Sequence, residues 1–130
     1  MRILLDTHVF LWYITGDPRL ASGYVDTIRD PVNVVCLSVI SVWEAVVKYQ
    51  LGKLPLPEPP ELFIPHQRER HRIEALPLDE SAVGRLPELP ALHKDPFDRM
   101  LICQAMHHGL TLLSLDAAVG AYSGLVSVLR

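Results

Sequence analysis

Short runs of apolar residues recur along the chain, and within each run the apolar positions are continuous instead of alternating with polar ones. Continuous runs of this length are typical of strands that are covered on both faces of a sheet. The pattern predicts five strands, at residues 2–5, 32–37, 73–78, 110–115 and 126–129.

Longer segments with helix-start and helix-stop residues separate these runs. The residue pairs Asp17-Pro18 and Asp95-Pro96 are each typical of a helix start, because proline fits the first helical position. We predict helices at about 7–15 and 18–29, from Ser38 or Ser41 to Leu51, at 61–72 with a bend at Pro65, at 79–86 and at 95–108, and a helical turn at 117–122. Residues 54–60, with four of the eleven prolines, and residues 87–90 are predicted to be irregular.

Strands that alternate with helices indicate a parallel sheet with helices on both faces, because a parallel connection has to cross back over the sheet. The expected fold is therefore an α/β/α sandwich with a central parallel sheet of about five strands. The sequence shows no internal repeat, low-complexity segment or linker, and 130 residues suit one domain, so we expect a single domain over residues 1–130.

Composition favours a folded protein without membrane spans. Hydrophobic residues make up 49% of the chain and charged residues 21%, which is typical of a compact globular protein. No apolar stretch reaches the length of about 18 residues that a membrane helix needs, and Asp6 interrupts the first apolar run, so we expect neither a membrane segment nor a signal peptide. Cys36 and Cys103 both lie within apolar runs, which predicts core residues and fits a reducing cytoplasm.

Four acidic residues are predicted at one edge of the sheet. Asp6 and Asp116 follow the first and fourth predicted strands, Glu44 lies on the helix after the second strand, and Asp98 lies in the first turn of the helix that Asp95-Pro96 begins. Ligands of open parallel sheets bind at the carboxyl ends of the strands. Because clustered carboxylates repel one another, we expect a bound cation, and Mg²⁺ or Mn²⁺ suits oxygen ligands. Such a cation activates water for attack on a phosphodiester.

Each acid also has a structural alternative. Asp6 and Asp116 can end their strands in turns, and Glu44 can pair with Lys48 at the helical i,i+4 spacing. Asp95 and Asp98 have the spacing of helix caps; we assign the cap to Asp95 and the ligand to Asp98.

The six histidines are not predicted to form a site. His107-His108 closes a helix, where positive charge is favourable, and His66 and His71 lie on a charged helix. His8 is close enough to Asp6 in the sequence to approach the acidic site. The sequence contains no glycine-rich phosphate loop, nucleophile elbow or zinc-ligand spacing.

Four segments together resemble the successive motifs of PIN domains, and most closely those of the VapC-like branch. The segments are Leu4-Leu5-Asp6-Thr7-His8, Ser41-Val42-Trp43-Glu44-Ala45 with Leu51-Gly52-Lys53-Leu54, His93-Lys94-Asp95-Pro96-Phe97-Asp98-Arg99-Met100-Leu101, and Leu113-Ser114-Leu115-Asp116. The likeness runs in the family's order from residue 3 to about residue 129.

The resemblance implies a Mg²⁺- or Mn²⁺-dependent endoribonuclease that acts as the toxin of a VapBC-type toxin–antitoxin pair. Carried over by position, the acidic site comprises Asp6, Glu44, Asp98 and Asp116, with Ser114 matching a serine or threonine of the family. Val119 departs from the pattern, since the family often has an aromatic residue there. The resemblance also implies an RNA substrate, a VapB-like antitoxin that covers the site, a homodimer and a cytoplasmic location.

The net charge of −3 excludes nucleic-acid binding by overall charge, so RNA has to be held by local basic groups or by bound cations. Arg68, Arg70 and Arg72 cluster in one predicted helix. Further basic groups adjoin the predicted site elements: Lys48, Lys53, Lys94 and Arg99.

Three other classes of protein share parts of this pattern. A receiver domain needs a lysine near the last strand, and no lysine follows Lys94; a haloacid-type phosphatase needs a second aspartate at position 8, which is His8. A catalytically silent PIN-like module that binds RNA or protein is the remaining alternative. Retention of all four acids argues against it, and a metal titration distinguishes the two.

Overall fold

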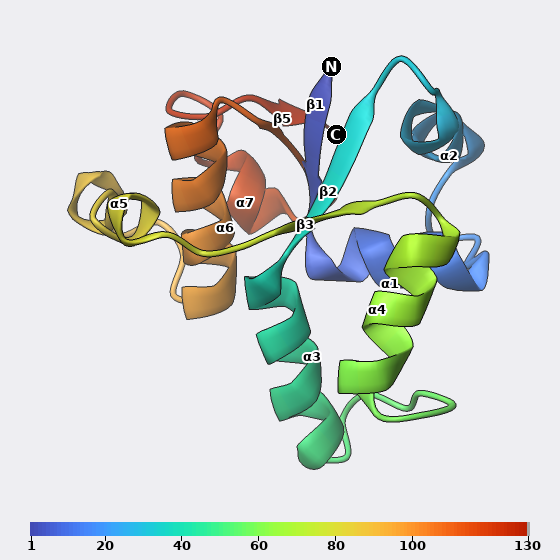
Figure 1. The fold of residues 1–130 in the computed structure, drawn as a ribbon. Coiled ribbons are helices and arrows are strands. Elements are labelled where there is room, and N and C mark those ends of the chain that lie inside the picture. The colour runs from blue at the N-terminus through green and yellow to red at the C-terminus, as the bar shows by residue number, and fades with distance from the viewer. Residues whose placement is uncertain (130) are drawn as a thin grey trace.

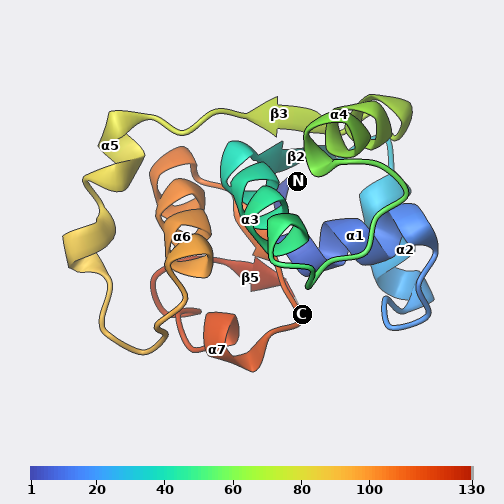
Figure 2. The ribbon, with the colours of Figure 1, turned by 90° about the horizontal axis from the view of Figure 1, so that it is seen from below.

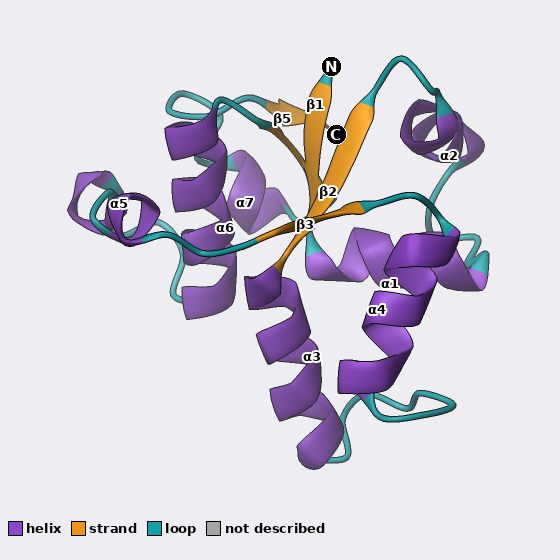
Figure 3. Cartoon of the chain, viewed as in Figure 1, coloured by secondary structure: helices purple, strands orange, loops and turns teal. Residues whose placement is uncertain are grey.

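The computed structural model describes residues 1–129 and has a central sheet of five parallel strands (Figures 1 and 3). The strand order is β3-β2-β1-β4-β5, and Ile3 in β1 lies between Val35 in β2 and Thr111 in β4. The strands are β1 (Arg2–Leu5), β2 (Val34–Ser38), β3 (Glu74–Leu76), β4 (Thr111–Leu113) and β5 (Val128–Leu129). The predicted parallel sheet of five strands is confirmed.

Seven α-helices and one 3₁₀ helix connect and cover the strands within the described residues. They are α1 (Thr7–Thr15), α2 (Ser22–Arg29), α3 (Val39–Gln50), α4 (Pro60–Arg70), α5 (Glu80–Val83), η1 (Leu86–Glu88), α6 (Pro96–His108) and α7 (Ala117–Gly120). Seen from below, α5, α6 and α7 lie on one side of the sheet and α1, α2 and α4 on the other (Figure 2). The α/β/α sandwich predicted from the sequence is therefore also confirmed.

The continuous apolar strands supply two separate cores, because successive strand residues point to opposite faces. Leu4 and Leu112 pack with α6 and with the fully buried Tyr122 on one face. Ile3 and Leu5 pack against α1, α2 and α4 on the other face. The central strands are covered on both faces, so polar side chains lie at their carboxyl ends.

Some predicted helix boundaries were wrong, because local turns or a short 3₁₀ helix take the place of the expected elements. The second helix begins at Ser22 instead of residue 18, because Asp17 forms a turn in which its side chain accepts from Arg19 N (2.9 Å) and its carbonyl accepts from Leu20 N (3.1 Å). The predicted break at 87–90 begins within η1, which spans Leu86–Glu88. Ser38, not Ser41, caps α3 by accepting from Ile40 N (3.0 Å).

The expectation that both cysteines are core residues agrees with the structure. Cys36 and Cys103 are buried in the core as unpaired thiols, and burial raises the pKa of Cys36 to about 11. Among residues 1–129, none of the helices combines the length and the apolar character that crossing a membrane requires.

Candidate metal centre

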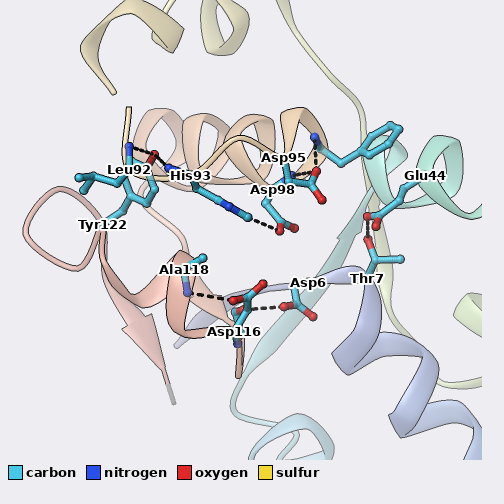
Figure 4. Close-up of polar contacts among 12 residues, drawn as sticks. Asp6, Thr7, Glu44, Leu92, His93, Asp95, Asp98, Asp116, Ala118 and Tyr122 are labelled. Atoms are coloured by element: carbon cyan, nitrogen blue, oxygen red, sulfur yellow. Dashed lines mark hydrogen bonds and ion pairs between the residues drawn. The ribbon is translucent and has the colours of Figure 1, made fainter. Parts of the chain in front are cut away.

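The carboxyl ends of β1, β2 and β4 meet at one edge of the sheet, and the N-terminus of α6 lies at the same edge (Figures 1 and 4). Asp6 follows β1, Asp116 follows β4 and Asp98 lies in the first turn of α6. Figure 4 shows the side chains of these three residues directed toward one another, with Glu44 beside them. The fold thus brings all four predicted acids to the same edge.

Asp6 is buried and tightly held. Its side chain is only 4% exposed; one carboxylate oxygen accepts from Val9 N (2.8 Å) and the other from Ser114 Oγ (2.5 Å). Burial raises the pKa of Asp6, the bonds from Ser114 and Val9 oppose the rise, and Glu44 adds to it. Asp6 is therefore both the N-cap of α1 and a buried acid near other acids.

Glu44 is the most buried of the four acids, with 2% exposure, because α3 runs between the two cores. Its Oε1 accepts a hydrogen bond from Thr7 Oγ1 (2.7 Å), and its Oε2 forms an ion pair with Lys48. The pairing with Lys48 that was the alternative interpretation is present, together with the burial that favoured a ligand. Thr7 and Lys48 fix the direction in which this carboxylate points.

Asp95 and Asp98 have different environments although they are three residues apart. Asp95 caps α6, accepting from Phe97 N (2.9 Å) and from Asp98 N (3.2 Å), which fits the assigned cap. Asp98 has a side chain that is 15% exposed, and its Oδ2 lies 2.8 Å from His93 Nε2. Burial raises the pKa of Asp98 to about 6; His93 opposes the rise, and Asp95, Glu44 and Asp6 add to it.

Asp116 is exposed and caps the short helix α7 by accepting from Ala118 N (2.8 Å). It still belongs to the cluster, because one ligand atom from each of His93, Asp98 and Asp116 lies within 4.8 Å of the others. Val119, the departure from the family pattern, is buried in the core, so its role there is in packing.

His93 is a site residue that the sequence interpretation missed when it placed no histidine in a site. The chain is anchored beside it, since Leu92 N and His93 N both donate to Tyr122 Oη (3.1 and 3.0 Å). Its position five residues before Asp98 in the motif was the only available signal, and this spacing matches no periodicity of strand or helix. His8, expected to approach Asp6, lines a cleft together with Asp6; it is exposed and packs against Trp12.

The donors at this edge fit a divalent cation that prefers oxygen ligands. Asp6 and Glu44 both raise the pKa of Asp98, and Glu44 also raises the pKa of Asp6. A cation among them would remove the repulsion that raises those pKa values. The carboxylates of Asp6, Glu44 and Asp98, with that of Asp116 at the exposed side, are oxygen ligands of the type that magnesium and manganese prefer.

A cleft of about 360 Å³ opens beside the acids, lined by Asp6, His8, Trp12, Arg19, Leu115 and Asp116. The Arg19 guanidinium stands 5.0 Å from the centre of the Trp12 ring and pairs with Asp17. A second cleft of about 350 Å³ continues past Trp12 to Lys53. Two of the basic residues named from the sequence, Lys48 and Lys53, therefore adjoin the site or its clefts. Arg19 also lines both clefts, and the sequence interpretation missed it.

The chain is similar to known proteins over nearly its whole length. A family model described as PIN domain matches residues 3–124. Ribonuclease VapC16 of Mycobacterium tuberculosis strain H37Rv is 38% identical over 68 residues, which are 49% of this chain and 48% of that protein. The match thus spans about half of that curated relative.

Solved structures with the same fold include toxin–antitoxin complexes. VapBC2 from Rickettsia felis, bound to a promoter DNA fragment, aligns with a TM-score of 0.72 at 15% identity, covering 99% of this chain and 98% of that one. DNA-bound VapBC from Salmonella typhimurium aligns with a TM-score of 0.71 at 18% identity, covering 99% and 97%. At these identities the likeness establishes the fold.

Proposed function

Because the chain belongs to the PIN domain family, we propose that it is a metal-dependent endoribonuclease and the toxin of a VapBC-type toxin–antitoxin pair. The observation that carries the proposal is the convergence of Asp6, Glu44, Asp98 and Asp116 at one sheet edge beside an open cleft. The name of the curated relative, a ribonuclease, supports the same class of reaction.

These four acids would hold Mg²⁺ or Mn²⁺, with His93 adjoining Asp98. When bound, the cation supplies Lewis acidity, which lowers the pKa of a water and balances charge on the phosphodiester. The chain's own groups orient the ligands: Ser114 holds Asp6, and Thr7 and Lys48 hold Glu44. Fixed ligands need no rearrangement when the cation binds, which favours binding.

RNA would be held by local contacts, since the net charge is −3. The cleft beside the acids offers Arg19 for a phosphate and the Trp12 ring for stacking on an unpaired base. Both features favour single-stranded RNA as the substrate class.

The five strands form one sheet shared by both cores, which supports a single domain over residues 1–130.

An antitoxin partner is proposed from the solved VapBC complexes and from exposed apolar surface on this chain. An apolar cleft of about 640 Å³ lies between α3, α4 and β3, and Val39 and Trp43 of α3 are more than two-fifths exposed. Apolar surface of this kind is typical of protein interfaces. We propose that an antitoxin and a second copy of the chain cover such surfaces, and that the pair acts in the cytoplasm.

Cleavage of labelled single-stranded RNA by two matched variants tests the activity and the site together. Asp98→Asn keeps the shape of the side chain and removes a ligand charge, so we expect cleavage to fall by orders of magnitude while folding survives. Asp95→Asn keeps the cap, since asparagine caps helices as well as aspartate does, so cleavage should stay near that of the wild type. EDTA should abolish the wild-type activity.

Undiminished cleavage by Asp98→Asn, or cleavage that persists in EDTA, would contradict the proposed site. A catalytically silent module predicts a different result, in which the wild type binds neither Mn²⁺ nor Mg²⁺ in a calorimetric titration. Asp6→Asn is the matched variant for that titration, and equal metal affinity of the variant and the wild type would exclude Asp6 as a ligand.

A further inference from the structure

A second group of metal-ligating side chains lies at the opposite end of α6 from Asp98. His107 and His108 form the last turn of α6, and Asp79 immediately precedes α5, which packs beside α6 (Figure 1). One ligand atom from each of the three residues lies within 4.8 Å of the others. Two imidazoles and a carboxylate are thus brought together from two segments of the chain.

The two carboxylate oxygens of Asp79 have different contacts. Its Oδ1 caps α5 by accepting from Ala82 N (3.0 Å), which leaves Oδ2 facing the histidines. Oδ2 lies 3.3 Å from His108 Nε2 and 4.0 Å from His107 Nε2. The cap fixes the position of the aspartate, so the free oxygen is held in place before any ligand binds.

His108 Nε2 is buried, and although Asp79 Oδ2 lies 3.3 Å away, this nitrogen makes no well-formed hydrogen bond with any of the described residues. A buried polar nitrogen without a well-formed hydrogen bond is unfavourable, so its presence calls for an explanation. The backbone around it is well fixed, because Arg2 donates to the His108 carbonyl (3.1 Å) and Gly109 ends the helix in the left-handed conformation. A metal ion bonded to Nε2 would satisfy this nitrogen.

The group is separate from the acidic site. Asp98 and His107 are nine residues apart on one straight helix, and a rise of 1.5 Å per residue places them about 14 Å apart along its axis. Its ligand chemistry also differs, since imidazole nitrogen suits zinc and carboxylate oxygen suits magnesium.

We propose that Asp79, His107 and His108 bind Zn²⁺, with water completing a tetrahedral site. The ion would join the N-terminus of α5 to the C-terminus of α6 and so hold the segment between β3 and α6 against the helix that carries Asp98. The site has a structural, stabilising role, since Asp79 and the two histidines take no part in the acidic cluster.

The test is a calorimetric zinc titration of full-length Asp98→Asn protein, free of any histidine tag, because that background weakens competing binding at the acidic site. We expect one zinc ion per chain, and affinity lower by about tenfold or more in Asp79→Asn and in His107→Gln, each added to the background. Asparagine retains the α5 cap, so Asp79→Asn removes the charge without unfolding α5. The matched control is His66→Gln, an exposed histidine on α4.

A second readout uses Co²⁺ in place of zinc, because its visible absorption is far stronger in a tetrahedral site than in an octahedral one. The tetrahedral spectrum should be present in the background protein and in His66→Gln, and lost in His107→Gln. No zinc binding by the background protein, or equal zinc affinity in all the variants, would overturn the proposal and leave the group as ion pairs between Asp79 and protonated histidines.

Discussion

At the residue scale, the site depends on acids that the fold buries before any cation is bound. Asp6 and Glu44 are each less than a twentieth exposed, yet only Glu44 has a fixed positive partner, Lys48. Asp98 shares its carboxylate with His93 and feels the charges of the other acids. Repulsion among these groups is the cost of the arrangement, and it predicts how the protein responds to pH.

The raised pKa of Asp98, about 6 against an ordinary 3.8, predicts a loss of stability as pH rises in the metal-free protein. The folded state holds a proton on Asp98 that the unfolded chain releases, so the contribution is full below pH 3.8 and is lost as pH rises through about 6. The expected loss from this residue is on the order of 2–3 kcal/mol.

Urea unfolding in EDTA at several pH values measures this contribution. In Asp98→Asn the decline between pH 4 and pH 7 should be shallower than in the wild type by about that amount. Parallel curves for the two proteins would mean that Asp98 ionises at its ordinary pKa.

Lys48 is predicted to substitute in part for the cation in the metal-free protein. Lys48→Met leaves Glu44 buried with only the Thr7 hydrogen bond, so the free energy of unfolding should fall by about 2 kcal/mol in EDTA. Excess Mg²⁺ should restore more stability to this variant than it adds to the wild type. Lys53→Met, at an exposed position, is the control and should behave like the wild type; an equal loss there would refute the role of the pair.

At the scale of elements, α3 and α6 have to be aligned because each carries an acid of the site. Ser38 links them: its Oγ accepts from Ile40 N at the start of α3 and donates to Gln104 Oε1 on α6 (2.5 Å). Gln104 is fully buried and its amide donates to Pro77 O (3.2 Å). This chain of bonds connects β2, α3, α6 and the segment before α5.

Ser38→Ala is therefore expected to cost about 2 kcal/mol, because it removes a helix cap and leaves a buried amide oxygen without its donor. Ser22→Ala, at an exposed position that begins α2, should change stability by less than about 0.5 kcal/mol. Chemical denaturation of the two variants checks both values. A loss in Ser38→Ala no larger than in Ser22→Ala would show that the linkage contributes nothing.

At the scale of the whole molecule, metal binding is predicted to stabilise the fold, because a cation at the sheet edge binds residues that meet only in the folded state. At a Mg²⁺ concentration 100 times its Kd, mass action adds about 2.7 kcal/mol. The melting temperature should therefore rise by several degrees from EDTA to excess Mg²⁺.

Two variants separate this response from the proposed zinc site. Asp6→Asn should lose the magnesium response and keep the zinc response. Asp79→Asn should keep the magnesium response, and in the Asp98→Asn background it should lose the zinc response. A melting temperature unchanged by Mg²⁺ in the wild type would mean that the acids are satisfied within the protein.

The sequence by itself determined the elements and their order, since the signals for these are local. Continuous apolar runs predicted the strands, and Asp95-Pro96 with Gly109 gave the start and end of α6. The strand pattern also predicted Asp6 and Asp116 at the sheet's carboxyl edge, because a residue that follows a parallel strand lies there in any strand order, and the motifs added Glu44 and Asp98 on helices. Errors arose where a turn competed with a helix start, as at Asp17.

Only the tertiary structure decided which side chains touch each acid. Ser114 bonds to Asp6 across 108 residues and Thr7 to Glu44 across 37, and Asp79 meets His107 and His108 through the packing of α5 on α6. Propensity and periodicity act over a few residues, so they contain no information about such pairs. The strand order and the packing of helices on the sheet bring these groups together, and with them set the charge and the ligands of both proposed metal sites.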